Sequence, residues 1–213
     1  MARAPAAATP GRGVKRTAAQ RSLRDLRRGQ IVAVARALVA EGGPEGLTIG
    51  ALEERLDFTR GVITYHFADR DEIVDAVLAS AAAEIDAATR SGVRGSATVD
   101  ERVRAVLESN VRGYLEHREA GQILLSFWGR PAGAGRRARA ASIIFAGYRA
   151  QSAELVRAAR KANPRCTARP RPLGAVLVGV VIGLVVQAYL DPAALDTDAA
   201  LEEAAACVSA RLR

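Results

Sequence analysis

Apolar residues recur at helical spacing along almost the whole chain, and this periodicity constrains the fold more than any other feature. They return every three or four positions, and no strand pattern competes with them. Aromatic residues make up only 4% of the chain, which also disfavours a β-sandwich. The sequence therefore predicts an all-α fold of nine helices, separated by Gly- and Pro-containing breaks near 42–44, 91–98, 131–137 and 163–172.

Capping residues give the starts of several of these helices. Thr48, Thr59 and Thr98 stand at N-cap positions, and Asp69 with Glu72 forms a D-x-x-E capping box. The helices are expected at about 23–42, 48–56, 59–67, 69–90, 98–114, 121–128, 138–161, 173–190 and 197–212.

The net charge of +8 is concentrated at the start of the chain. The first 28 residues carry eight basic residues and one acidic residue, whereas the other 185 carry 23 basic and 22 acidic ones. Residues 1–20 also lack helical periodicity, so we expect residues 1–22 to form a disordered basic arm. Such an arm suits a polyanion, most commonly nucleic acid, and a solvated tail is the alternative.

Few residues offer the chemistry of an enzyme or a metal site. His66 and His117 lie far apart and lack Cys or carboxylate partners at zinc-ligand spacing. The sequence has no nucleophile elbow, phosphate-binding loop or dinucleotide-binding glycine pattern. We therefore expect no enzymatic activity, no cofactor and no metal. Cys166 and Cys207 cannot build a disulfide framework, and no long apolar run follows the basic arm, so we expect a cytoplasmic protein.

Residues 47–71, LTIGALEERLDFTRGVITYHFADRD, contain the most informative local pattern. Two short helices joined by a tight turn and steadied by a third form a helix-turn-helix, whose second helix enters the major groove of DNA. On that helix Arg60 can pair with guanine or phosphate, and Gly61 lets the backbone come close. A small helical subdomain with ordinary solvent-facing residues is the alternative. The outward residues are Thr59, Arg60, Gly61, Thr64 and Tyr65, with His66 at the end.

The run from Gln30 to Ala79 resembles the N-terminal domain of the TetR family of bacterial transcriptional regulators. The matching segments are IVAVARALVAEGG, LTIGALEERL and TRGVITYHFADRDEIVDAVL. The resemblance implies a DNA-binding domain at residues 23–68 and an effector-binding and dimerisation domain at residues 69–213. It also implies a homodimeric repressor that binds a palindromic operator and is released when a small effector tilts the helix at Asp69–Ala88.

Roles carried over by position assign a DNA contact to each matching residue. Thr48 and His66 would meet phosphate, and Arg70 would replace the usual Lys at the start of the fourth helix. The sequence departs from the family at Asp57, usually Gly, and at Thr64, usually aromatic. Asp tolerates the unusual backbone angles of a turn, so the departure at Thr64 affects base preference more. The residues implied to face the major groove are Thr59, Arg60, Gly61, Thr64 and Tyr65.

The predicted DNA-binding domain is not itself basic, because residues 29–70 hold four basic and six acidic residues. DNA affinity should therefore depend on the arm, on Arg27 and Arg28, and on helix N-termini directed at phosphates. We expect a steep salt dependence that weakens when residues 1–28 are removed.

Residues 172–190 carry no charge and include Gly179 and Gly183 at Gly-x-x-x-Gly spacing. In isolation this segment could span a membrane, which would make the protein a membrane-anchored helical interaction protein. The favoured alternative is a buried helix in a subunit interface, because the resemblance places the four-helix bundle of the dimer here, together with residues 197–212. The expected dimer contacts are Gly179, Gly183, Val186, Leu201 and Val208.

Several polar or aromatic residues lie on otherwise apolar faces of the C-terminal half. An apolar cavity with a few polar groups is the usual form of a ligand site, although plain core packing explains each residue equally well. The resemblance implies a hydrophobic or aromatic small-molecule effector. The candidate ligand contacts are Asn110, Tyr114, Gln122, Trp128, Phe145 and Tyr148.

Overall fold

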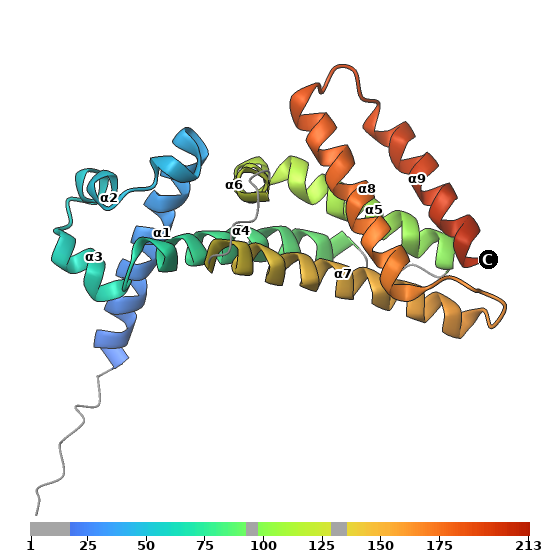
Figure 1. The fold of residues 1–213 in the computed structure, drawn as a ribbon, viewed down its shortest axis with the longest axis horizontal. Helices are drawn as coiled ribbons and strands as arrows, with labels where there is room; N and C mark the ends of the chain where they lie inside the picture. Colours follow the sequence, from blue (N-terminus) through green and yellow to red (C-terminus); the bar gives the residue numbers. More distant parts are fainter. Residues whose placement is uncertain (1–17, 93–97, 129–135) are drawn as a thin grey trace, which may run out of the picture.

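A computed structural model describes residues 18–92, 98–128 and 136–213 of the chain (Figure 1). Within these ranges the chain forms nine helices and no strand, so the expected all-α fold is confirmed. The helices are α1 (Ala18–Gly46), α2 (Ile49–Leu56), α3 (Arg60–His66), α4 (Arg70–Gly92), α5 (Val99–Glu116), α6 (Arg118–Trp128), α7 (Arg136–Ala162), α8 (Pro170–Leu190) and α9 (Thr197–Leu212).

Helices α1 to α3 form a small lobe at one end of the molecule, and α4 runs from this lobe into the other helices (Figure 1). Helices as short as α2 and α3 are not stable alone. Their stability comes from burying one apolar face, which their helically spaced apolar residues form. Leu52 of α2, Ile63 of α3 and Ile31 of α1 are fully buried in the core.

The turn between α2 and α3 depends on Asp57, which adopts left-handed backbone angles (φ 51°, ψ 32°). This confirms the expectation that Asp can occupy a position where Gly is usual. Thr48 accepts a hydrogen bond from the Ala51 amide at 3.1 Å, as expected of an N-cap. The side-chain cap expected of Thr59 is wrong, because its hydroxyl makes no capping hydrogen bond. The main-chain carbonyl of Thr59 accepts a hydrogen bond from the Val62 amide at 2.9 Å.

Four helices begin earlier in the chain than expected. α1 begins at Ala18 and continues to Gly46 across a kink at Gly43 (φ 66°), close to its expected end. α6 and α7 also start before their expected residues. α8 begins at Pro170 rather than Leu173, because the first turn of a helix needs no amide donor and so accepts proline. Most of the expected disordered arm and much of two expected connections lie outside the described residues.

The two capping boxes differ in outcome. At α5, the N-cap expected at Thr98 is confirmed, and Thr98 and Glu101 bond each other's backbone amides as a reciprocal box. At α4, Asp69 accepts from the Glu72 amide at 2.7 Å, but the Glu72 carboxylate accepts from the amide of Ala68 at 2.8 Å. The Asp69 side chain therefore caps α4 as expected, and Glu72 also reaches back to the residue before Asp69.

Apolar residues of all nine helices form one continuous core, in which α7 and α8 are in close contact. Gly174 makes this contact possible, because a Cβ atom there would lie 2.8 Å from the Ala153 amide nitrogen. By length and composition α8 is apolar enough to cross a membrane, with a mean hydropathy of 2.4. One side of it nevertheless packs into the core, through Leu177, Val181 and Val185.

The structure corrects two of the five expected dimer contacts. Leu201 and Val208 are only 5% and 4% exposed, because α9 turns them into the core of its own chain. They are thus not available to a second chain. Gly179 is exposed, and Gly183 and Val186 are half-buried, so these three still lie on the accessible side of α8.

Candidate functional site

Helix α3 presents an open polar surface to solvent. Thr59, Arg60, Gly61, Thr64 and Tyr65 are all exposed, and Tyr65 retains 59% of its accessible area. The Thr64 hydroxyl donates to the Arg60 carbonyl at 2.9 Å, which leaves its oxygen as an acceptor. Arg60 forms no ion pair with any residue in the described ranges. Its guanidinium is therefore available to a polyanion.

His66 does not belong to this surface. Its side chain is 6% exposed, because α3 ends there and the ring turns toward α1. Burial lowers the pKa of His66, and the positive charges of Arg24, Arg27 and Arg28 lower it further. A neutral, buried imidazole offers no charge to a phosphate, so the expected phosphate contact of His66 is wrong.

Arg70 also has a different role from the one expected. Its guanidinium donates to the main-chain carbonyls of Pro44 and Leu47, which precede α2. Pro44 follows the kink at Gly43 in the last turn of α1, and Leu47 comes directly after this helix, where helical partners are lacking. Arg70 thereby holds the start of α4 against the lobe of α1 to α3 instead of extending toward a phosphate.

Three arginines of α1 lie over aromatic rings of the helix-turn-helix. Arg24 lies 5.9 Å from the centroid of the Tyr65 ring, and Arg27 lies 5.7 Å from that of Phe58. Arg28 lies 3.9 Å from the Phe67 ring centroid and donates to the His66 carbonyl at 2.7 Å. It also pairs with Glu72 at 3.2 Å. Of the two arginines expected to bind DNA, Arg28 is thus occupied within the chain, whereas Arg27 is exposed.

A cavity of about 260 Å³ lies between α4, α5, α7 and α8. Apolar side chains form most of its wall, and polar groups from all but α8 reach it. An enclosed apolar space with few polar groups is the usual form of a small-molecule site. Its lining residues are Asp86, Thr89, Arg90, Val106, Leu107, Asn110, Tyr114, Tyr148, Gln151, Ser152, Leu155, Leu177, Val178, Val181 and Ile182.

The six expected ligand contacts divide into two groups. Asn110, Tyr114 and Tyr148 line the cavity, and Asn110 donates to the Val106 carbonyl at 2.7 Å. Gln122 is exposed on α6 and lies outside the lining. The rings of Trp128 and Phe145 pack against each other at a tilt of 54°, with centroids 4.5 Å apart, and both make edge contacts with the Tyr148 ring. The expectation that Gln122, Trp128 and Phe145 line the cavity was wrong. Helical spacing does not tell which side of a helix faces a cavity.

Among the polar residues of the cavity wall, Tyr114 is buried and Asp86, Asn110 and Tyr148 are half-buried, whereas Arg90 and Gln151 are exposed. Burial raises the pKa of Tyr114 and of Tyr148, so both phenols remain protonated donors. Neither hydroxyl has a hydrogen-bond partner of good geometry in the described ranges, although the two are close enough to influence each other's pKa. Burial likewise raises the pKa of Asp86, and the charge of Arg90 opposes that shift.

Asp86 and Arg90 were missed by sequence reasoning. Polar residues on a long helix ordinarily form its solvent-facing side, so nothing local distinguishes them. Only the packing of α7 across α4 turns them toward the cavity. Among the described residues, no group of three or more His, Cys, Asp or Glu side chains could hold a metal ion.

Comparisons with known proteins agree with this geometry. Residues 31–77 match the family model of bacterial regulatory proteins of the tetR family, which covers the helix-turn-helix. Residues 99–213, more than half of the chain, match the C-terminal model of the BetI-type transcriptional repressors.

Individual relatives cover most of the chain. The HTH-type transcriptional regulator BetI of Burkholderia ambifaria strain MC40-6 is 26% identical over 182 residues, which span 84% of this chain and 91% of the relative. A structure described as a transcriptional regulator of Pseudomonas aeruginosa PAO1 has a TM-score of 0.77 at 17% identity, covering 88% of this chain and 91% of the other. Another, from Saccharomonospora viridis in complex with choline, has a TM-score of 0.69 at 17% identity, covering 84% and 93%.

Regulators of this kind bind DNA, typically as dimers, and bind small-molecule effectors, and they are generally not enzymes. The N-terminal lobe and the C-terminal helices each match their own part of the family pattern. The chain belongs to the TetR family of bacterial transcriptional regulators, with a C-terminal region of the BetI type.

Proposed function

We propose that this protein is a cytoplasmic repressor that binds a palindromic operator as a homodimer and is released by a small-molecule effector in the cavity. The observation that carries the proposal is the path of α4. This helix contributes Asp86, Thr89 and Arg90 to the cavity, and at its other end Arg70 and Glu72 bond to the DNA-binding lobe. A molecule that shifts α4 at the cavity would therefore shift the lobe that carries α3.

The DNA-binding part of the proposal rests on the exposed side of α3. Arg60 can form a bidentate pair with guanine, Gly61 permits close approach, and Tyr65 offers a ring and a hydroxyl. We assign DNA binding to residues 23–68 and effector binding and dimerisation to residues 69–213. Arg27 and Thr48 are proposed as phosphate contacts, because both are exposed beside this surface.

The dimer part of the proposal rests on the accessible side of α8. Val176 retains 55% of its accessible area, and Gly179 follows on the next turn toward Gly183. Small residues allow two helices to approach closely, and an exposed apolar side is a typical subunit interface. We propose that this side of α8 packs against the same side of a second copy.

The cavity favours a small organic cation as the effector. Asp86 places a carboxylate in the wall, four residues before the guanidinium of Arg90, and the rings of Tyr114 and Tyr148 can contact a cation through their faces. The structural neighbour from Saccharomonospora viridis was solved with choline, which has this chemistry. This narrows the hydrophobic or aromatic effector expected from the sequence to a cation with apolar substituents.

Selection of bound duplexes from a random DNA library tests the DNA-binding part. A dimeric reader should enrich a palindrome whose half-sites lie about one helical turn apart. If a folded, dimeric preparation enriches no sequence, even after refolding without ligand, the proposed DNA function fails.

Calorimetry with choline and with its uncharged isostere 3,3-dimethylbutan-1-ol tests the effector class. Choline should bind and release DNA, the isostere should bind far more weakly, and Asp86→Asn should remove the difference. As a matched control, Asp198→Asn changes an exposed carboxylate on α9 and should leave binding unchanged. Equal binding of the two compounds would contradict a cationic effector while leaving the DNA function intact.

A further inference from the structure

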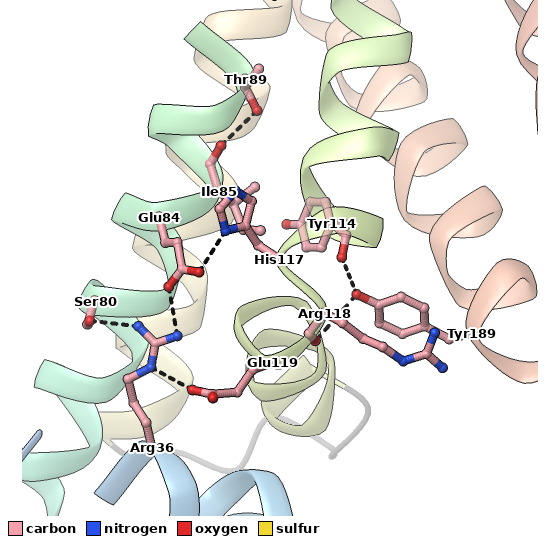
Figure 2. Close-up of polar contacts among 10 residues, drawn as sticks. All are labelled: Arg36, Ser80, Glu84, Ile85, Thr89, Tyr114, His117, Arg118, Glu119 and Tyr189. Carbon is pink, nitrogen blue, oxygen red and sulfur yellow. Dashed lines mark hydrogen bonds and ion pairs between the residues drawn. The ribbon is translucent and has the colours of Figure 1, made fainter. Parts of the chain in front are cut away.

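A polar cluster joins the DNA-binding lobe to the helices around the cavity. We define the Arg36 cluster as Arg36 of α1, Ser80 and Glu84 of α4, His117 between α5 and α6, and Glu119 of α6 (Figure 2). These residues come from three helices and one helix junction, and none of them lines the cavity. Arg36 is the only one of the five that comes from the lobe of α1 to α3.

Arg36 holds three partners at once. Its guanidinium donates to Glu84 Oε2 at 2.7 Å, to Glu119 Oε1 at 3.0 Å and to Ser80 Oγ at 3.1 Å (Figure 2). Its side chain is only 16% exposed. A planar guanidinium with fixed donor directions fits such a site, and a lysine ammonium would not reach all three acceptors together. The geometry therefore defines one orientation of α1 against α4 and α6.

Glu84 connects Arg36 to the junction between α5 and α6. Its other oxygen, Oε1, lies 2.8 Å from His117 Nδ1. Because a carboxylate only accepts, Nδ1 carries the proton in this contact. Burial alone would raise the pKa of Glu84, but the hydrogen bonds from Arg36 and His117 hold it below its usual value. Glu84 is therefore an anion shared between two parts of the molecule.

The same junction is tightly packed against a wall of the cavity. The His117 amide donates to the Gly113 carbonyl at 3.0 Å, and the Tyr189 hydroxyl donates to the carbonyl of Tyr114 (Figure 2). Tyr114 lines the cavity, and its Cδ1 atom lies 3.1 Å from the position of a Cβ atom on Gly121. The amide of Gly121 in turn donates to the His117 carbonyl at 3.0 Å, so Gly121 links the Tyr114 ring to the junction that carries His117.

We propose that Arg36 and Glu84 are positioning residues that set the orientation of the DNA-binding lobe, and that His117 relays a change at Tyr114 to them. This inference rests on the proposed function and adds to it a specific route from the cavity to the lobe. The route runs from Tyr114 through His117 and Glu84 to Arg36. This route acts in addition to a direct tilt of α4, because α4 carries both Glu84 of the cluster and Asp86 of the cavity wall.

The first test measures the orientation of the lobe without DNA or effector. Spin labels on Glu54→Cys of α2 and on the native Cys207 of α9 report the distance between the two regions, since both positions are exposed and Cys166 is buried. Labelled protein is diluted into unlabelled protein so that only distances within one chain are recorded. Glu84→Gln should broaden or shift the distance distribution. Glu154→Gln, which breaks an exposed ion pair within α7, should not.

The second test measures operator affinity for the same variants. If the lobe loses its fixed orientation, Glu84→Gln should weaken operator binding by about five- to hundredfold, the usual range of coupling between sites. Arg36→Lys keeps the charge but not the forked geometry, so it should fall between wild type and Glu84→Gln. An unchanged distance distribution in Glu84→Gln overturns the inference. Failure of the wild-type chain to bind any DNA would instead overturn the proposed function, and the distance measurement would still decide whether the Arg36 cluster sets the orientation of the lobe.

Discussion

The exposed surface of α3 and the cavity between α4, α5, α7 and α8 are constructed in opposite ways. The α3 surface consists of neighbouring residues on one short helix, and most of their side chains extend into solvent. The cavity brings together residues from position 86 to position 182, and its wall includes fully buried core residues such as Leu107, Tyr114 and Leu177. A residue on the first surface can serve recognition alone, whereas a residue in the cavity wall also supports the core.

The largest expected contrast is in stability. Tyr114→Ala removes a side chain that is 1% exposed and should lower the free energy of unfolding by about 3–5 kcal/mol, as other buried aromatic truncations do. Tyr65→Ala makes the same change on α3 and should cost less than about 1 kcal/mol. Urea unfolding of both variants measures the difference. Tyr114→Phe, which keeps the ring, should remain much closer to wild type, and equal costs for the two alanine variants would show that the contrast is wrong.

A second contrast separates the two recognition functions. Arg60→Ala should weaken operator binding by about 1–3 kcal/mol, the range for a lost guanine contact, and leave effector affinity unchanged. Asp86→Asn should do the reverse, because the carboxylate lies in the cavity. Fluorescence anisotropy with labelled operator and calorimetry with choline record the two affinities. Arg55→Ala provides a control on α2, since that arginine pairs with Glu41. If Arg55→Ala weakens operator binding as much as Arg60→Ala does, the loss at Arg60 does not come from a specific base contact.

The basic arm should increase DNA affinity without any base preference. Removing residues 1–17 deletes four basic residues and keeps α1 as the structure describes it. The slope of log affinity against log salt should become shallower by up to about 3–4 per chain, because fewer counterions are released. Binding titrations at several salt concentrations measure this slope. Identical slopes for the full and shortened chains would remove the arm from the DNA interface.

The smallest expected effect concerns His66 and pH. Its pKa is lowered in the folded state, so the unfolded chain binds a proton more readily than the folded one. The free energy of unfolding should therefore decrease as the pH falls below about 6.5, the ordinary value for histidine, toward the lowered pKa of the folded protein. His66→Gln should flatten this dependence in urea titrations between pH 5 and 8, compared with the wild type. An unaltered profile in His66→Gln would show that another group is responsible.

Local features could be predicted from the sequence with good accuracy. The cap at Thr48, the box at Thr98 and Glu101, and the left-handed Asp57 each depend on atoms within a few residues of one another. The apolar period likewise gave the nine helices, and the errors at their starts are mostly a few residues. Two of the misplaced side chains, His66 and Arg70, lie at helix ends. There the helical period no longer determines which way a side chain turns.

The sequence by itself determined the helical class, the helix-turn-helix and the outward residues of α3, because helical hydrogen bonds and caps join residues three or four positions apart. Tertiary structure decided where α4 meets α7, so it alone placed Asp86 and Arg90 in the cavity and withdrew Leu201 and Val208 into the core. It also brought Arg36 to Glu119, which lies 83 positions away along the chain. Such contacts depend on how whole helices pack, and many helices with the same apolar pattern could pack differently.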